Sequence, residues 1–296
     1  MTRVLVTGAS GLLGRALIDG WRFRFAVIAA ARERQPIGGE QWLGDLTGPG
    51  AAAEIIAAAR PDVVVHAAAW TDVDGCEADP RSAFLINAEA SARLAAEANR
   101  CGAEFVYIST SAVFDGEQGD YREEETPSPI NVYGQSKLAG EQAVMAAHSR
   151  ALVLRVSLEG FRRTGMPPGF VQWVVEGVRR GDPRNVCTDW RHTLVFADNV
   201  PAIIESFLGA QLAGVYHVAG VIGTSNWEIA MAAAEEFALD RELIRPILSS
   251  TLNLRARRPA DVTLSSAKMR EVLGDLVWPL PAALLDLHRR QMIAAG

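Results

Sequence analysis

The chain is poor in cysteine and has no long apolar run. Only three cysteines occur among its 296 residues, Cys76, Cys101 and Cys187, and none forms a CxxC pair. So sparse a set excludes a disulfide framework and a thiolate metal site, and it is typical of a reducing compartment. The five histidines lack the spacing of metal ligands. No stretch could span a bilayer and no apolar targeting segment precedes the first strand, so we expect a cytoplasmic protein without metal or membrane contact.

Positive charge is also in short supply. The formal net charge is -6, and of the 29 lysines and arginines only two are lysines, Lys137 and Lys268. The arginines are dispersed, so the chain has neither the basic face of a nucleic-acid-binding protein nor a polybasic membrane patch. With 49% hydrophobic and 22% charged residues, the composition is that of an ordinary globular protein. Small molecules are therefore the expected ligands.

Short apolar runs alternate with alanine-rich helical segments in the first half of the chain, as in "DVVVHAAA" and "EFVYIST", which follow such segments. Strands that are apolar on both faces, each followed by a helix, predict an α/β fold with a doubly wound parallel sheet, the Rossmann arrangement. The alternation of strands and helices ends after about Ser157, where a loop rich in Gly, Pro and Arg begins. We predict a Rossmann domain over 1–157, which the chain rejoins near 193–220. Residues 158–192 and 221–296 then form a smaller C-terminal substrate-binding lobe.

The segment "VLVTGASGLLG" places a glycine-rich turn between a strand and a helix. Its glycines allow a tight turn, close approach of a pyrophosphate to the backbone, and close packing of a helix whose free N–H groups favour anions. The spacing G-x-x-G-x-x-G is one residue wider than the common form. The turn therefore predicts a dinucleotide cofactor. The residues expected to line it here are Gly8, Ser10, Gly11, Leu12, Leu13 and Gly14.

The second strand ends in "AAARER", which bears on the choice of dinucleotide. Arg32 and Arg34 could grip the 2′-phosphate of NADP, whereas Glu33 could bind the ribose hydroxyls of NAD. We therefore expect NADPH, with NADH as the alternative. In "GDL", Asp45 could accept a hydrogen bond from the adenine amino group, with Leu46 beside it, or could serve the turn alone.

In "YGQSK", Tyr133 and Lys137 lie four residues apart on an expected helix, so their side chains share one face. A free tyrosine has a pKa of about 10, and a nearby ammonium is expected to lower it toward the range of acid–base catalysis. Lysine is also a compact donor for ribose hydroxyls, a role that arginine fits poorly. The strand "FVYIST" ends one element earlier, where the hydroxyl of Thr110 could bind a substrate carbonyl beside Tyr133. Together with the glycine turn, these features predict catalysis on a carbonyl group.

On these motifs the chain resembles an extended short-chain dehydrogenase/reductase, and more narrowly the dTDP-4-dehydrorhamnose reductase family. The resemblance covers nearly the whole chain, through "VLVTGASGLLG", "VVHAAAWTDVDGCEADP", "YISTSAVFDG", "PSPINVYGQSKLAGE" and "RARRPADVTLSSAKM". It implies a catalytic triad of Thr110, Tyr133 and Lys137. The further cofactor contacts that it implies are Ala67, Ala68 and Ala69. The substrate contacts that it implies are Thr71, Val73, Asp74 and Asn87.

Several positions depart from the pattern of that family, and they fall on the substrate side. Leu158 follows "RVS" where the family usually has an aromatic residue, so a side chain that could stack on a sugar is missing. Gly169 stands where an asparagine could hold a nucleotide phosphate. The stretch "TDWRHTLVFAD" also differs, and Arg191 or His192 could contact the substrate there.

The resemblance implies NADPH-dependent reduction of a keto group, at C4 of a nucleotide-linked 4-keto-6-deoxy sugar. Dehydration is not expected, because Ser111 and Ala112 follow Thr110 in place of the Asp-Glu pair of the sugar-nucleotide dehydratases. Three alternatives stay open: a nucleotide-sugar epimerase that retains NAD, a reductase of a smaller carbonyl compound, and a non-catalytic NADP-binding subunit like the regulatory subunit of methionine adenosyltransferase. The oligomeric state is open too, a homodimer included.

Overall fold

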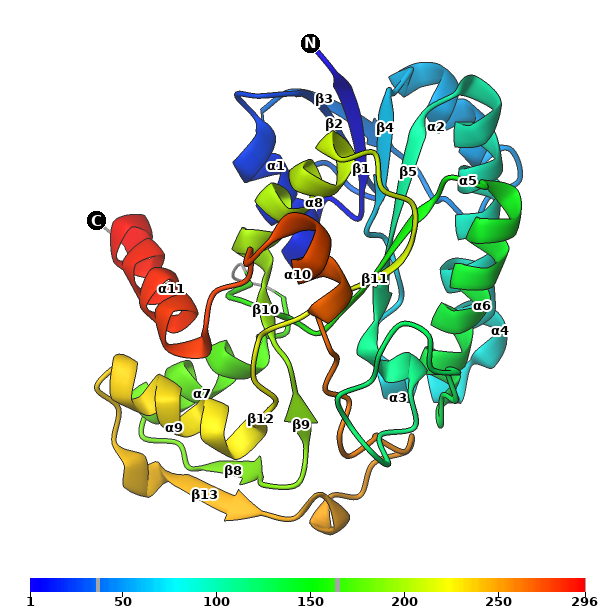
Figure 1. Ribbon diagram of the computed structural model, residues 1–296. Coiled ribbons are helices and arrows are strands. Elements are labelled where there is room, and N and C mark those ends of the chain that lie inside the picture. Colours follow the sequence, from blue (N-terminus) through cyan, green and yellow to red (C-terminus); the bar gives the residue numbers. More distant parts are fainter. Residues whose placement is uncertain (36–37, 163–165, 296) are drawn as a thin grey trace.

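The computed structural model describes residues 1–35, 38–162 and 166–295. Seven strands form one sheet in which every hydrogen-bonded pair is parallel (Figure 1). In sheet order they are β11 (Gly214–Val218), β6 (Leu152–Val156), β5 (Glu104–Thr110), β4 (Val63–His66), β1 (Arg3–Thr7), β2 (Ala26–Ala31) and β3 (Glu40–Leu43). The chain moves outward from β1 in one direction to β3 and in the other to β11, so its crossovers lie on both faces. The predicted doubly wound α/β fold is confirmed.

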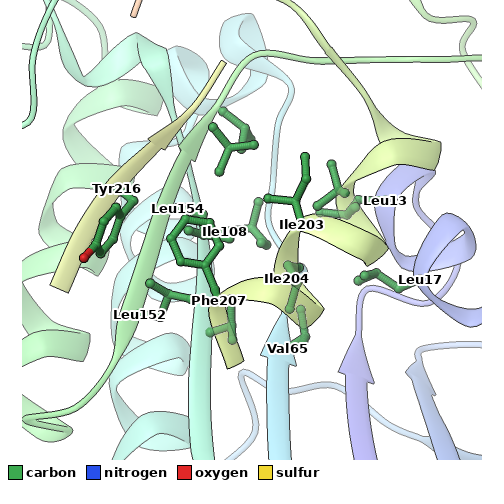
Figure 2. Close-up of a cluster of buried hydrophobic side chains, with 14 of the residues drawn as sticks. Leu13, Leu17, Val65, Ile108, Leu152, Leu154, Ile203, Ile204, Phe207 and Tyr216 are labelled. Atoms are coloured by element: carbon green, nitrogen blue, oxygen red, sulfur yellow. The ribbon is translucent and has the colours of Figure 1, made fainter. Parts of the chain in front are cut away.

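Helices cover both faces of this sheet. On one face lie α1 (Leu12–Trp21), α8 (Val200–Gly209) and α10 (Ala267–Leu273), and on the other α2 (Ala51–Ala59), α5 (Ala90–Cys101) and α6 (Val132–Ala147). Figure 2 shows Ile203, Ile204 and Phe207 of α8 packed among the side chains of the strands. Each such side chain contributes about 2 kcal/mol when it is fully buried.

The inner strands of the sheet are mainly apolar because their alternate residues point to opposite covered faces. In β6, Leu152 and Leu154 join the core beneath α8 (Figure 2). Val153 joins the core on the opposite face of the sheet. Arg155 is the one charged residue of this strand, and it is buried as well. The unbroken apolar runs of the sequence are thus a consequence of the two helical layers.

Most of the other elements lie toward one end of the sheet, in the lower part of Figure 1, and α11 lies at the left of the view. Before α5 come α3 (Val73–Ala78), α4 (Pro80–Phe84) and a π-helical turn (Leu85–Glu89). After β6 come short paired strands: β7 (Leu158–Glu159) with β10 (Val195–Phe196), β9 (Arg191–His192) with β12 (Thr224–Ser225), and β8 (Arg184–Cys187) with β13 (Ile244–Ile247). The helices there are α7 (Phe170–Arg179), α9 (Asn226–Glu236) and α11 (Leu280–Ala295).

Apolar side chains of these three helices share a separate core, which includes Val175, Ile229 and Leu284. The segment therefore packs as a unit of its own beside the sheet. The assignment of substrate binding to this segment, and of cofactor binding to the sheet, stays a prediction. In the ranges that the structure describes, no helix combines the length and the apolar character needed to cross a membrane.

Candidate active site

A cavity of about 1070 Å³ runs along the carboxyl ends of β1, β2, β4, β5 and β6. In open α/β sheets, ligands bind at this edge where the strand order reverses, which is between β1 and β4 here. Most of the residues predicted to bind the cofactor line this cavity: Gly8, Ser10, Gly11, Leu12, Leu13, Gly14, Arg32, Asp45, Leu46, Ala67, Ala68 and Ala69. Their placement agrees with a shared ligand, and their individual roles stay predictions.

The glycine turn after β1 is shaped to admit a phosphate. Gly8 has a φ of 71°, in the left-handed region, and a Cβ there would lie 2.7 Å from the backbone nitrogen of Ala68. A Cβ on Gly14 would lie 2.1 Å from the carbonyl oxygen of Gly8, so only glycine lets α1 approach the turn. Gly11 is the N-cap of α1 and provides no capping side chain, so the first N–H groups of the helix are left to an anion. The turn therefore fits a dinucleotide pyrophosphate.

Arg32 lies at the end of β2, with an exposed side chain that lines the cavity. Oδ1 of Asp45 accepts hydrogen bonds from the backbone N–H of Thr47 at 2.9 Å and from its hydroxyl at 2.8 Å. These two bonds, helped by the charge of Arg32, lower the pKa of Asp45. Asp45 thus stabilises the turn that contains Thr47 and also borders the cavity. Arg34, which we expected to share in phosphate binding, does not line the cavity.

The three predicted catalytic residues meet on the cavity wall. Thr110 ends β5, while Tyr133 and Lys137 lie one turn apart on α6. Asn131 caps α6 by accepting a hydrogen bond from the N–H of Gly134 at 2.8 Å, which fixes where the helix begins and hence where Tyr133 lies. A hydrogen bond joins the hydroxyls of Thr110 and Tyr133.

Burial sets the pKa values of Lys137 and Tyr133. Lys137 is 2% exposed, and its Nζ donates to the carbonyl oxygen of Ile108 at 2.7 Å. Burial lowers the pKa of Lys137 to about 7, against an opposing effect of Glu141. Burial also raises the pKa of Tyr133 to about 12, against the opposing hydrogen bond from Thr110. The prediction that Lys137 lowers the pKa of Tyr133 is therefore wrong for this arrangement, because desolvation of the phenolate dominates.

A histidine that the sequence analysis missed holds the ends of β1 and β4 together. Nδ1 of His66 lies 2.7 Å from the hydroxyl of Thr7, and its Nε2 lies 2.9 Å from the hydroxyl of Ser91. The hydroxyl of Thr7 also accepts from the N–H of Ala68 at 3.2 Å. Burial lowers the pKa of His66 to about 3, so the ring is neutral. His66 therefore positions the alanine wall of the cavity; its signal in the sequence was a polar residue at the end of an apolar strand.

Only part of the predicted substrate contacts reach the cavity. Thr71 and Val73 line it, whereas Asp74, Asn87 and Arg191 do not. Asn87 is fully buried, and its side chain brackets the backbone of Trp70. Its Oδ1 accepts from the N–H of Trp70 at 2.8 Å, and its Nδ2 donates to the carbonyl oxygen of that residue at 3.0 Å. Asn87 is thus corrected from a substrate contact to a residue that positions Trp70, which itself borders the cavity.

Asp74 and Arg191 are engaged by the C-terminal part of the chain. Asp74 accepts from Nη2 of Arg258 at 3.0 Å and from the N–H of Ala256 at 2.8 Å. Arg191 donates to the carbonyl oxygen of Gly223 at 2.8 Å, and its Nε lies 3.4 Å from a carboxylate oxygen of Asp261. Both side chains therefore hold segments together, and their predicted contacts with substrate are not supported.

Beyond the triad, the cavity is bordered by residues that follow β6 and by the segment of α7, β9 and α9. They include Ser157, Leu158, Glu159, Arg162, Phe170, Trp190, His192 and Asn226. Burial lowers the pKa of His192 to about 4, so its imidazole is neutral in the physiological range. His192 thus lies where a substrate contact was expected, while its neighbour Arg191 does not. This side of the cavity combines the indole of Trp190 and the neutral imidazole of His192 with two ionisable side chains, Glu159 and Arg162.

The profile of one protein family, described as the RmlD substrate binding domain, matches residues 1–286. The chain belongs to this family. The probable low-salt glycan biosynthesis reductase Agl14 of Haloferax volcanii is 34% identical over 274 residues, which cover 91% of each chain. Methionine adenosyltransferase 2 subunit beta of Pongo abelii is 33% identical, over 98% of this chain and 91% of that protein. The crystal structure of dTDP-4-dehydrorhamnose reductase from Bacillus anthracis in complex with NADP is 26% identical, with a TM-score of 0.87 over 98% of this chain and 99% of that one.

Membership of the RmlD family confirms the resemblance that the motifs predicted. The seven-stranded sheet with its helical layers is also the fold of this solved reductase. The expected enzyme class, an NAD(P)-dependent oxidoreductase of the extended short-chain dehydrogenase/reductase type, is confirmed at the level of the family.

Proposed function

We propose that this RmlD-family protein catalyses the NADPH-dependent reduction of a keto group on a nucleotide-linked deoxysugar, with dTDP-4-dehydrorhamnose as the first substrate to test. The observation that carries the proposal is the placement of Thr110, Tyr133 and Lys137 on the wall of the cavity into which the glycine turn opens. Support comes from the likeness to a dTDP-4-dehydrorhamnose reductase whose structure contains NADP.

The residues present fit NADPH. Gly8 lets the turn pack against the backbone of Ala67 and Ala68, which a Cβ would meet, and the uncapped start of α1 provides free N–H donors for a phosphate. Arg32 lines the same cavity and would hold the 2′-phosphate, which is the basis for proposing NADPH rather than NADH. When bound, this cofactor supplies a hydride to the substrate carbonyl.

Tyr133 is the proton donor in this proposal. A pKa of about 12 keeps its phenol protonated at neutral pH, which is the state that a reductase requires before turnover. The phenol passes its proton to the carbonyl oxygen as that oxygen gains negative charge. The hydroxyl of Thr110 lies beside the phenol, and in the complex it donates its one hydrogen to the carbonyl oxygen in place of the phenol oxygen, which orients the carbonyl. Lys137, buried behind them with a pKa of about 7, holds ribose hydroxyls and exchanges a proton easily near neutrality.

The test follows absorbance of NADPH in the presence of dTDP-4-dehydrorhamnose. Wild-type protein is expected to oxidise NADPH, and Tyr133→Phe is expected to lose at least about 100-fold in rate, since it lacks the proton donor. Tyr216→Phe is the matched control, because Tyr216 packs in the core beneath α8, away from the cavity wall. Equal rates for wild type and Tyr133→Phe would reject the assigned role of the phenol.

A second candidate is a non-catalytic NADP-binding subunit. The observation that favours it is the 33% identity to methionine adenosyltransferase 2 subunit beta over 98% of this chain. The same preparation separates the two: a subunit of this kind would bind NADPH in a titration yet leave its absorbance unchanged with keto sugars. Oxidation of NADPH that depends on Tyr133 would reject it.

A further inference from the structure

Glu159 places a buried carboxyl group in the wall of the cavity, where β7 approaches the start of α7. The residue is 4% exposed and borders the cavity. Its Oε1 accepts from the N–H of Gly160 at 2.8 Å, and its Oε2 accepts from the N–H of Phe170 at 3.2 Å. Arg162, which also lines the cavity, favours the ionised form of Glu159 by its charge.

This carboxyl group takes the position that an anion would occupy at the start of α7. The first N–H groups of a helix lack partners within the helix and attract phosphates. In α7, the first of them, on Phe170, already donates to Glu159. Gly169, the N-cap, makes room for this arrangement: a Cβ there would lie 2.6 Å from Oε1 of Glu159 and 2.6 Å from the carbonyl oxygen of Gly160. Glu159 and Gly169 are therefore coupled, which gives a structural reason for the missing asparagine at 169.

We propose that Glu159 is a specificity-determining residue, whose carboxyl group excludes a phosphate from the side of the cavity formed by β7 and α7 and reserves that side for a hydroxyl or ammonium group of the substrate. A phosphate there would find the first N–H of α7 occupied and would face a group that carries or gains the same charge. A hydroxyl can instead donate to the carboxyl oxygens, each of which has a further acceptor site.

The inference rests on the proposed function in one respect, since it assumes that this cavity takes the substrate. For a nucleotide-linked substrate, it places the sugar hydroxyls against α7 and the diphosphate away from it.

The exclusion should depend on pH. Burial raises the pKa of Glu159 to about 7, so its negative charge is largely present above pH 7 and largely lost below it. The other ionisable groups on this wall are Arg162, whose guanidinium stays charged, and His192, whose pKa of about 4 keeps it neutral. Neither changes its charge between pH 6 and pH 8. Lys137, elsewhere in the same cavity, has a pKa of about 7 and does change its charge over this interval. The part of the pH dependence of phosphate binding that Glu159→Gln abolishes therefore reports on Glu159.

The experiment measures binding of dTDP and of thymidine to the NADP-loaded protein by calorimetry at pH 6 and pH 8. Glu159→Gln removes the charge at nearly constant volume, and Glu159→Ala also frees the N–H of Phe170. At pH 8 we expect dTDP to bind Glu159→Gln at least about tenfold more tightly than wild type, and Glu159→Ala more tightly still. At pH 6 the gain shrinks. Thymidine affinity stays constant, and so do both affinities in the control Glu235→Gln, which removes an exposed carboxylate of α9.

Three results would overturn the inference: unchanged dTDP affinity in Glu159→Gln at both pH values, tight dTDP binding by wild type that does not vary with pH, or no dTDP binding by a folded Glu159→Gln. If Glu159→Ala fails to fold, the glutamine variant decides alone. Because no turnover is needed, the outcome is separable from that of the proposed reaction. Wild type that leaves NADPH unoxidised, together with the expected dTDP affinities, would reject the reaction and leave the role of Glu159 intact.

Discussion

Replacing Glu141 with glutamine tests how the buried charges behind the triad set the charge of Lys137. Glu141 is 1% exposed and lies one turn after Lys137 on α6. It accepts from Nη2 of Arg155 at 2.8 Å and from Nε of Arg155 at 3.0 Å. It also accepts from the hydroxyl of Ser109, the residue before Thr110. This ion pair therefore ties α6 to β5 and β6 beside the catalytic residues.

Two effects of known sign follow from Glu141→Gln. The guanidinium of Arg155, 4% exposed, loses its carboxylate, and breaking a buried pair in this way costs about 3–5 kcal/mol. The corresponding fall in Tm is roughly 10 °C for a chain of this size. Side chains one turn apart interact over about 6 Å, where unit charges attract by about 3 kcal/mol at an effective dielectric constant near 20. Because Arg155 cancels part of this attraction, the pKa of Lys137 should fall by about one unit from its value of about 7.

The assay exploits the scarcity of lysine. Protein labelled with ¹³C at the lysine Cε gives signals from only two lysines, and exposed Lys268, whose Nζ donates to the carbonyl oxygen of Val215 at 2.7 Å, is an internal reference. Lys137 should titrate near pH 7 in wild type and lower in Glu141→Gln. The matched control is Glu40→Gln, which breaks an exposed pair with Arg3 and should cost less than about 1 kcal/mol. A Lys137 signal that titrates near pH 10, or at the same pH in both proteins, would refute the reasoning.

Three other predictions are simpler to check. Gly8→Ala places a Cβ 2.7 Å from the nitrogen of Ala68 at a φ of 71°, so it should destabilise the fold by more than about 1 kcal/mol. It should also weaken NADPH binding about tenfold or more in a fluorescence titration, and wild-type affinity would contradict this. Arg32→Ala should weaken NADPH binding about tenfold and leave NADH binding unchanged, whereas equal losses for both cofactors would remove Arg32 from the 2′-phosphate. Burial depresses the pKa values of His66 and His217 to about 3, so both rings are neutral in the folded protein. Their contribution to stability is complete above the unfolded pKa of about 6.5 and is lost as the pH falls toward 3. Tm should therefore drop steadily on acidification from pH 6.5 to pH 4, and a flat profile would count against neutral buried rings.

The parts of the site that could be predicted from sequence are made by residues that are neighbours in the chain. The glycine turn and the spacing of Tyr133 and Lys137 are local patterns, and the doubly wound sheet follows from the alternation of strands and helices together with the rule for crossovers. The contacts that Asp74 and Arg191 make within the chain could not be predicted in this way. Their partners, Arg258 and Asp261, come from the C-terminal segment, and a pairing over such a separation leaves no local pattern.

The direction of the pKa shift at Tyr133 could not be predicted from the sequence either. The i, i+4 spacing places an ammonium on the same helical face, but the outcome depends on how far water is excluded from the phenol. The role of Asn87 was hidden for a similar reason, because its amide could equally have faced a ligand or the backbone of Trp70.

The edge strand β11 has a consequence for how the protein is made. It pairs with β6 but is encoded after α8, so the ribosome has completed the first six strands of the sheet long before this edge can close. Until then the nascent chain carries an unpaired strand edge and the uncovered apolar face that Ile203, Ile204 and Phe207 will later seal (Figure 2). A fragment that ends at Ser157 would keep both the unpaired edge of β6 and the uncovered apolar face of the sheet. Such a fragment should aggregate or bind chaperones, and the nucleotide-binding half is not separable by truncation.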